Sequence, residues 1–182
     1  MCSSDLVVPV RVPALSGALD YSGLFGNVLL YEFNQILGAQ YRAAPKDLFG
    51  PAVHSDLARG AQVSDETYQR ILRERPAQAA AVKQVFGTVD ALLAPVLPNL
   101  TPLQSAGPEV WARGRQFNLP FSFVGVPSVA VPCGFAAGMP VGLQVVANDL
   151  QEALLLRIAA ARSEEHTSEL QSLAYLVCRL LL

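Results

Sequence analysis

The sequence predicts an α/β fold in which helices flank an incomplete sheet. Two nearly continuous apolar runs of strand length, "VPSVAVPCG" and "VGLQVVA", suit strands that are buried on both faces. Helical and strand patterns follow in the order helices, strand, helix, two strands, helix, which indicates layers of helix on sheet. Three strands are few for a chain that is 52% hydrophobic. We therefore expect an α/β sandwich with an incomplete sheet.

Composition limits the functions that the chain can have. It has 182 residues, 15% charged residues and a formal net charge of -2. One domain, or part of a larger one, fits this length, and the chain is too apolar to be disordered. No basic stripe indicates a nucleic-acid surface. No signal peptide and no apolar run near the roughly 18 residues of a membrane span are apparent. We expect a cytoplasmic protein with no nucleic-acid or membrane partner.

Cysteine usage argues against a disulfide framework and against a metal centre. The three cysteines, Cys2, Cys133 and Cys178, form no C-x-x-C pair and no even set. A zinc site needs three or four ligands at regular spacing, and this pattern does not supply them. We therefore expect no metal and a reducing compartment.

Two helices are expected in the first third of the chain. In residues 21–45, apolar residues recur at helical spacing, and Gly38 or Pro45 would close the helix. A shorter helical piece covers residues 52–60 and ends on Gly60.

Residues 63–90 contain the clearest helix pattern. Ser64 is a good N-cap, and Pro76 should break or kink the helix because proline removes a backbone donor. A short apolar strand follows at residues 91–95. The last helix, at residues 149–161, would cover one face of the sheet.

Several ordered motifs resemble the C-terminal portion of the amidase signature family. They are "DALLAP", then the "FN" and "GVP" segment, then "VPCG" and "PVGLQ". With a weaker match upstream, the resemblance covers Val7–Ala161. It implies a partial amidase-signature α/β/α sandwich with an incomplete mixed sheet. It also implies cleavage of a carbon–nitrogen amide bond by a serine, a second serine on a cis peptide bond and a lysine, with no cofactor.

The family's catalytic residues do not carry over to this sequence. They belong to a Gly/Ser-rich segment, and no "GGSSGG"-like run occurs here. The two lysines, Lys46 and Lys83, lack the family's lysine context, and the one adjacent serine pair, Ser3–Ser4, has no glycine beside it. The sequence contains no G-x-S-x-G elbow, so it does not indicate a serine hydrolase of another kind. We expect a fragment without catalytic residues that is inactive by itself.

Three residues in the family-like segments are candidates for a substrate pocket. Asn118 follows Phe117 and could orient a loop near the acyl pocket, and Gln144 lies in a strand that looks buried. A structural role, with the amide bonding backbone in an irregular turn, is an equal alternative for Asn118, and Gln144 has the same ambiguity.

Other reactive or charged residues have simpler interpretations. Cys133 beside an apolar strand is expected in the core rather than as a nucleophile. His54 is expected to be a surface or capping residue rather than a general base. Arg113 and Arg115 are expected to be solvated charges rather than a guide for an anionic substrate.

The two ends of the chain look unlike the middle. "RSEEHTSELQS" and "LVCRLLL" look like the translated adapter of short-read DNA sequencing, in one frame, and "MCSSDL" looks like its opposite strand. We expect Met1–Leu6 and Arg162–Leu182 to be non-native ends around the amidase part, Val7–Ala161. The alternative is a real C-terminal helix with a capping box formed by Ser168 and Gln171.

Two classes of function remain open at this point. The first is an enzyme fragment whose complete parent protein hydrolyses a small-molecule amide. The second is a non-catalytic interaction module or subunit. Within the family, the amidase subunit of a tRNA-dependent amidotransferase is a further alternative. The sequence does not indicate an oligomeric state.

Overall fold

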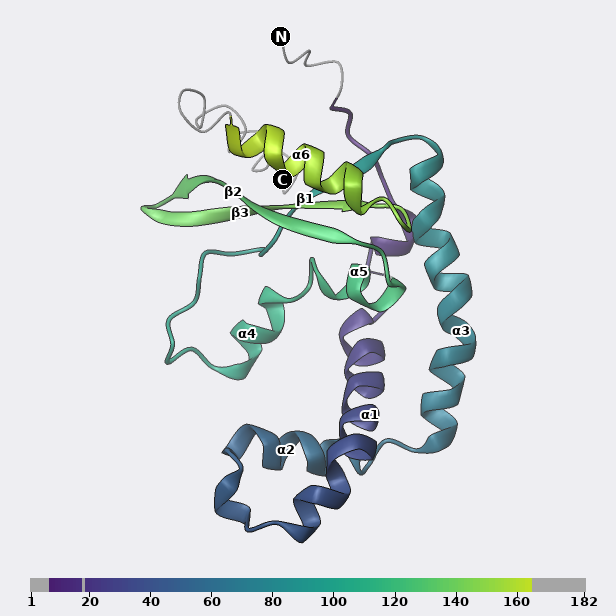
Figure 1. Cartoon of the computed structure of the whole chain (residues 1–182), viewed down its shortest axis with the longest axis vertical. Helices are drawn as coiled ribbons and strands as arrows, with labels where there is room; N and C mark the ends of the chain where they lie inside the picture. Colours follow the sequence, from purple (N-terminus) through teal and green to yellow (C-terminus); the bar gives the residue numbers. More distant parts are fainter. Residues whose placement is uncertain (1–6, 18, 165–182) are drawn as a thin grey trace.

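A computed structural model of the chain describes residues 7–17 and 19–164. The predicted non-native ends Met1–Leu6 and Arg162–Leu182 therefore lie outside the described residues, except for residues 162–164. The observed order of elements agrees with the expected one (Figure 1). The elements are α1 (Tyr21–Ala43), α2 (Pro51–Gly60), α3 (Asp65–Lys83), β1 (Ala91–Pro95), α4 (Pro108–Gly114), α5 (Leu119–Val124), β2 (Ser128–Ala136), β3 (Met139–Ala147) and α6 (Glu152–Glu164).

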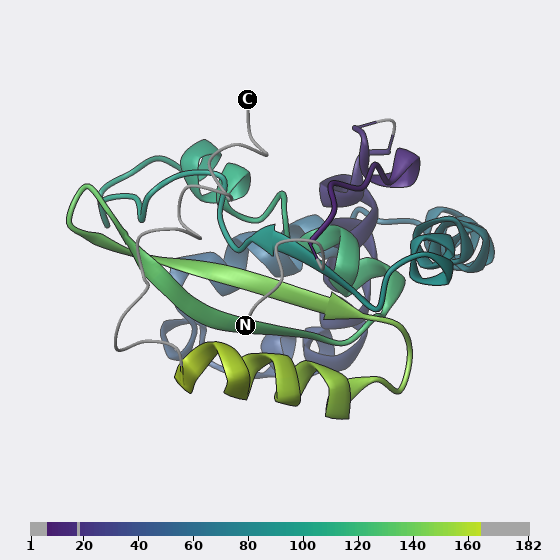
Figure 2. The same cartoon turned by 90° about the horizontal axis from the view of Figure 1, so that it is seen from above.

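The three described strands form a sheet in the order β1-β3-β2. Both pairings are antiparallel, with Leu92 opposite Val146 and Ala130 opposite Gln144. β2 and β3 form a hairpin that turns at Ala137 and Gly138, where the φ angles are 48° and 77°. The tip of this hairpin projects beyond the end of α6 (Figure 2). All three predicted strands are confirmed.

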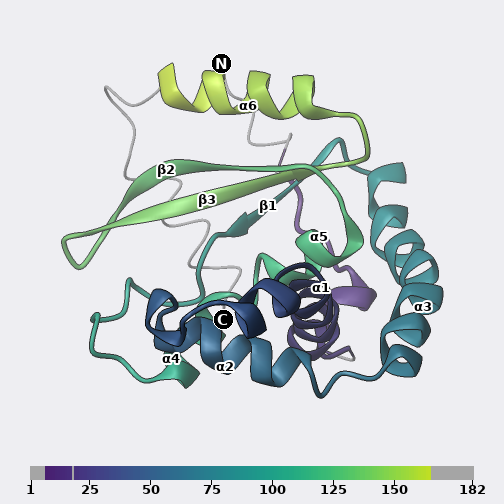
Figure 3. The same ribbon diagram turned by 60° about the horizontal axis from the view of Figure 1, so that its bottom comes forward.

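Helices cover both faces of the sheet (Figure 3). On one face, Val145 and Ala147 of β3 pack with Leu155 of α6. On the other face, Val146 packs with a core that includes Ile71 of α3 and residues of α1 and α5. β3 is therefore buried on both faces, as its continuous apolar run predicted. The layered α/β class is confirmed, with α6 as the predicted cover of one face.

α1 begins and ends for local reasons. The Asp20 side chain accepts a hydrogen bond of 3.0 Å from the N–H of Gly23, which satisfies a free donor of the first turn. Gly38, one of the two expected end points, lies inside the helix and is buried. The helix ends at Ala43, because Ala44 precedes Pro45 and adopts the extended conformation that proline imposes on its neighbour.

α3 begins as predicted but does not break at Pro76. The Ser64 hydroxyl accepts a hydrogen bond of 3.2 Å from the N–H of Thr67. The helix continues through Pro76 to Lys83. Pro76 is exposed, whereas Ile71 and Val82 are fully buried on either side of it. Tertiary packing of this face therefore compensates for the backbone hydrogen bond that proline cannot make.

Two tyrosines join α1 to α3 near the start of α3. The rings of Tyr31 and Tyr68 stack with centroids 4.1 Å apart. The Tyr31 hydroxyl donates to Asp65 at 2.8 Å, and the Tyr68 hydroxyl donates to Glu32 at 2.9 Å. These hydrogen bonds to carboxylates are the main reason why the pKa of each tyrosine is raised. Each helix therefore supplies one donor and one acceptor.

The stacked tyrosine pair should stabilise the fold in a pH-dependent way. Its contribution is present below pH 10.0, the ordinary tyrosine pKa, and is lost as the pH rises through the raised pKa of the folded state. We expect the Tyr31→Phe, Tyr68→Phe double variant to lose less stability than the unmodified chain above pH 10.0. Urea unfolding of both proteins below and above pH 10.0 measures the free energy of unfolding and its change with pH. An identical alkaline dependence in both proteins would contradict the assignment.

The core around α3 should be sensitive to truncation. Ile71 is 0% exposed, so Ile71→Ala should lower the free energy of unfolding by about 3 kcal/mol through lost burial and a residual cavity. Leu156 on α6 is 65% exposed, and Leu156→Ala should change it by less than about 0.5 kcal/mol. Urea denaturation compares the two variants. Equal losses would show that α3 is not part of the main core.

Candidate functional site

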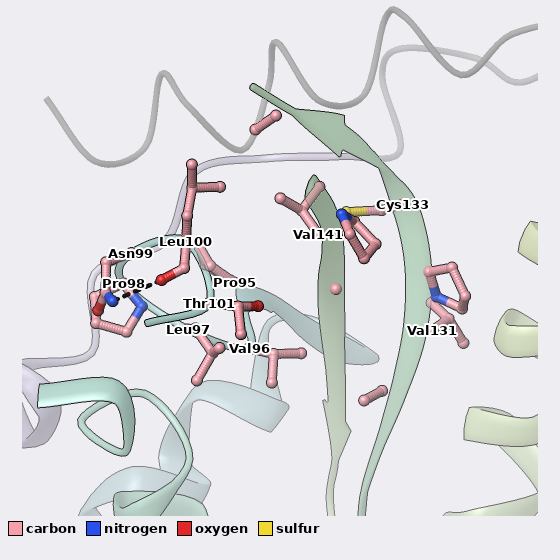
Figure 4. Close-up of a pocket in the computed structure, with 15 residues that line it drawn as sticks. Pro95, Val96, Leu97, Pro98, Asn99, Leu100, Thr101, Val131, Cys133 and Val141 are labelled. Carbon is pink, nitrogen blue, oxygen red and sulfur yellow. Dashed lines mark hydrogen bonds between the residues drawn. The ribbon is translucent and has the colours of Figure 1, made fainter. Parts of the chain in front are cut away.

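A cavity of about 560 Å³ lies between the segment that follows β1 and the hairpin of β2 and β3. Figure 4 shows residues of the 95–101 segment on one side and Val131, Cys133 and Val141 on the other. Its lining is largely apolar: Pro95, Val96, Leu97, Pro98, Asn99, Leu100, Thr101, Ala130, Val131, Pro132, Cys133, Ala136, Pro140, Val141 and Gly142. A concave apolar surface with few polar groups is typical of sites for small organic ligands.

The chain leaves β1 along one wall of this cavity. The N–H of Val96 still donates to the carbonyl of Gly142 at 3.1 Å, so the ladder with β3 extends one residue past Pro95. A Cβ at position 142 would lie 3.0 Å from Cγ2 of Val96. Glycine at 142 therefore lets the Val96 side chain lie against β3. Beyond this point the prolines and Leu97–Leu100 carry the chain around the cavity.

The polar groups in the lining are few. Thr101 contributes a hydroxyl, and Asn99 contributes a carboxamide whose Nδ2 donates to the carbonyl of Leu100 at 2.8 Å. This bond leaves Oδ1 of Asn99 as an acceptor. These groups can orient a polar ligand atom, but neither is a nucleophile with an adjacent base. Among the described residues, no group of three or more His, Cys, Asp or Glu side chains could hold a metal ion.

Cys133 belongs to the core, as expected. It is 2% exposed and packs with Val131 and Leu143 on the α6 side of the sheet, although it also lines the cavity. Burial raises the pKa of its thiol, and the positive charge of Arg162 opposes this shift. The thiolate is the reactive form, so a raised pKa disfavours a nucleophilic role.

The structure places Phe117 and Asn118 directly before α5. Both are half-buried, and neither lines the cavity. The backbone of Asn118 joins the turn to the helix, because its N–H donates to Arg115 and its carbonyl accepts from Ser122 at 3.1 Å. Its side chain makes no capping hydrogen bond at α5. The pocket role of these two residues stays a prediction.

Gln144 is a buried polar side chain in the middle of the sheet. It is 4% exposed, and its register neighbours are Ala94 in β1 and Ala130 in β2. Within residues 7–17 and 19–164, its Oε1 atom is buried without a hydrogen-bond partner. Gln144 does not line the cavity, but Ala130 and Gly142, which share its face of the sheet, do.

His54 lies in an aromatic cluster between α1 and α2, which differs from the expected surface or capping position. The Tyr41 hydroxyl and Nδ1 of His54 share a hydrogen bond of 2.6 Å, and Phe49 packs edge-on against both rings. The ammonium of Lys46 lies 3.7 Å from the centre of the Tyr41 ring. These contacts fix the connection between the two helices and explain the histidine by packing.

The other charged residues named in the sequence-based predictions lie outside the cavity. Arg113 and Arg115 are exposed, as expected. Lys83 pairs with Asp149 at 2.7 Å, which joins the end of α3 to the segment before α6. The family uses a lysine together with serines, but neither the contact of Lys83 nor those of Lys46 involve a serine.

Most of the cavity wall was not predicted from the sequence. The signal was present in "PVLPNLT", a proline-rich apolar segment that directly follows a strand and is too irregular to continue it. This segment forms a cavity only together with the β2–β3 hairpin opposite it. That neighbour becomes apparent only from the strand order in the sheet. The strand β2 alternates for the most part between exposed and buried positions, so it is not buried on both faces as its apolar run predicted.

The buried Gln144 carbonyl should cost stability. An acceptor without a partner in the core costs about 1–3 kcal/mol, so Gln144→Met, which keeps the volume, should raise the free energy of unfolding by about 1 kcal/mol. Chemical denaturation measures this change. The comparison variant is Gln78→Met on α3. Oε1 of Gln78 is also buried without a partner in the described residues, but Gln78 lies outside the "PVGLQ" segment. Destabilisation by Gln144→Met alone would show that its amide has a partner.

Comparisons with known proteins agree with the motifs. The family Amidase matches residues 7–156. A glutamyl-tRNA(Gln) amidotransferase subunit of Chloroflexus aurantiacus is 36% identical over 121 residues, which are 62% of this chain and 25% of that protein. The corresponding protein of Listeria welshimeri is 30% identical over 136 residues, 70% of this chain and 28% of that protein. The crystal structure of an amidase overlays with a TM-score of 0.72 at 29% identity, covering 82% of this chain and 35% of that one.

The family match extends over most of the described residues, whereas the chain spans about a quarter of the length of these curated relatives. The matched residues 7–156 include the segments "DALLAP", "VPCG" and "PVGLQ", from which the resemblance was inferred. The chain belongs to the amidase family.

Proposed function

We propose that the chain is the C-terminal part of an amidase-signature hydrolase, in which it forms one wall of the substrate pocket. The observation that carries this proposal is the family match over residues 7–156, combined with a chain that spans only 25% of its curated relative. The cavity beside the "DALLAP" and "PVGLQ" segments supports it, because a pocket wall needs a concave surface.

In the complete parent protein, the reaction is hydrolysis of a carbon–nitrogen amide bond. A serine, activated by a second serine and a lysine, attacks the amide carbonyl, the amine leaves, and water releases the acid. This chain supplies none of these three groups under the proposal. Its own part is to bind the substrate: the apolar lining, including Leu97 and Val131, excludes water and holds the apolar portion of a small-molecule amide.

A second candidate lies within the same family. The curated relatives from Chloroflexus aurantiacus and Listeria welshimeri, at 36% and 30% identity, are both subunits of a glutamyl-tRNA(Gln) amidotransferase. The parent protein would then act as the amidase subunit of a tRNA-dependent amidotransferase. The solved amidase is 29% identical to this chain and overlays with a TM-score of 0.72, which supports a stand-alone hydrolase as the first proposal.

We also propose a cytoplasmic location, on the basis of cysteine usage: the cysteine that the structure describes, Cys133, is a free and buried thiol. Among the described residues, no helix has the length and apolarity needed to cross a membrane.

The chain should have no hydrolase activity by itself. Purified chain should not hydrolyse a panel of aliphatic and aryl amides above the rate of buffer, because the proposal leaves it without nucleophile and base. Ammonia or amine release measures turnover, with a complete amidase of the family as the positive control. Turnover that is lost on substitution of a described residue would contradict the proposal.

The same preparation distinguishes a fragment from an independent interaction module. A module should be monodisperse and should not bind a hydrophobic dye. A fragment should bind the dye, because it exposes apolar surface that another part of the domain covers. Leu103, Leu150 and Phe135 are at least 70% exposed.

A further inference from the structure

The cavity beside the β2–β3 hairpin is formed by this chain itself. All of the residues that line it belong to the described segments 95–101, 130–136 and 140–142. Its volume of about 560 Å³ lies within the roughly 300–1,000 Å³ that are typical of sites for small organic molecules. The chain alone therefore carries a site whose lining determines which small molecules fit.

The lining of this cavity is uncharged. Among the described residues, no Asp, Glu, Lys, Arg or His side chain lines it. Burial raises the pKa of the Cys133 thiol, so this side chain is neutral near pH 7. The exposed Arg113 and Arg115 lie outside the lining. A carboxylate or an ammonium group in the cavity would lose water without meeting an opposite charge. The cavity therefore favours uncharged ligands over acids and zwitterions.

The hairpin contributes a face of short and flat side chains. Pro132 lies opposite Gly142, and Ala130 and Pro140 lie two residues from them on the same face of the sheet. Ala130, Pro132 and Pro140 are exposed. Because none of these side chains is longer than a proline ring, a planar group can lie against the strands and make close dispersion contacts over its whole area. A globular group of similar volume makes fewer such contacts.

The polar atoms lie at the mouth of the cavity. Asn99 and Thr101 are exposed, whereas Pro95 and Val96 are half-buried and line its inner part. Nδ2 of Asn99 donates to the carbonyl of Leu100 at 2.8 Å, which holds the carboxamide in place (Figure 4). Oδ1 of Asn99 remains as an acceptor for a ligand N–H, and the Thr101 hydroxyl can donate to a ligand carbonyl. An amide with an N–H group supplies both partners.

We propose that this cavity binds uncharged, planar aromatic carboxamides and that Asn99 selects them through their N–H group. The inference rests on the proposed function, for which it names the substrate class. The aromatic ring lies against the hairpin face of Ala130 and Pro132. The amide stays at the mouth between Asn99 and Thr101, where the catalytic groups of the parent protein must reach it. Amides of free amino acids, which carry two charges, are excluded.

Titration of the purified full chain with matched probes tests the proposal. Naphthamide is the planar, uncharged probe. Naphthoate keeps the rings and adds a charge, and N,N-dimethylnaphthamide keeps the rings but lacks an N–H. Adamantanecarboxamide keeps the amide and replaces the flat rings by a globular cage, and glutamine is a zwitterionic amide. Calorimetry measures the affinity, and the backbone amide NMR signals of Leu97, Val131 and Gly142 locate the bound probe in the cavity.

Three variants separate the cavity from the rest of the surface. Asn99→Leu removes the acceptor at similar volume. Leu97→Asp places a charge in the cavity wall, and Leu156→Asp places the same charge on α6, where Leu156 is 65% exposed and does not line the cavity. Leu156→Asp is therefore the control for binding to exposed apolar surface elsewhere.

Naphthamide should bind at one site per chain and shift the cavity signals. Naphthoate, adamantanecarboxamide and glutamine should each bind at least about tenfold more weakly. Asn99→Leu should weaken naphthamide about five- to tenfold through the lost hydrogen bond, and it should leave the affinity for N,N-dimethylnaphthamide unchanged. Leu97→Asp should weaken both naphthamides, and Leu156→Asp should weaken neither.

Each element of the proposal has a result that overturns it. Equal affinity for naphthamide and for naphthoate or glutamine would overturn the selection by charge, and equal affinity for adamantanecarboxamide would overturn the selection by shape. Equal losses for both naphthamides in Asn99→Leu would overturn the role of Asn99. These results leave the proposed function standing, because an amide still binds in the cavity. If no amide shifts the cavity signals, the proposed pocket wall fails together with the inference.

Discussion

The burial of β3 on both faces is the constraint from which the rest of the structure follows. Val145, Val146 and Ala147 are consecutive and fully buried, although successive side chains of a strand point to opposite faces. Both faces must therefore be covered, and one layer of helices cannot do this. α6 covers one face, and α1, α3 and α5 cover the other. The α/β/α layering is the consequence of a strand without a polar side.

The other end of β3 is not buried on both faces, and it lines the cavity. Exposure along the strand falls from Met139 and Pro140, which are exposed, to Leu143, which is buried. The exposed end belongs to the hairpin that projects beyond α6 (Figure 2). Pro140 and Val141 line the cavity there. One strand thus anchors the fold at one end and supplies a wall of the candidate site at the other, which places that wall on a rigid element.

Sequence reasoning succeeded where local chemistry decides and failed where neighbours decide. The strands were recognisable because β3 is nearly continuously apolar, and the start of α3 was recognisable because Ser64 caps it through its own hydroxyl. Gly38 and Pro76 were expected to end or bend helices, but packing of α1 and α3 keeps both helices intact. The cavity could not be located from motifs, because its walls are far apart in sequence and meet only through the order β1-β3-β2.

Among the described residues, β3 holds a buried polar group without a partner beside a strand at the edge of the sheet. Gln144 has a buried oxygen without a partner in the described residues, and its register neighbour Ala94 belongs to β1, which lies at an edge of the described sheet. An unpaired buried acceptor lowers the free energy of unfolding, and an open strand edge favours aggregation. Neither feature is therefore explained by the stability of the isolated chain. Both features lie in the "DALLAP" and "PVGLQ" segments that mark the family. These segments are therefore better explained by the complete amidase domain than by the folding of this chain alone.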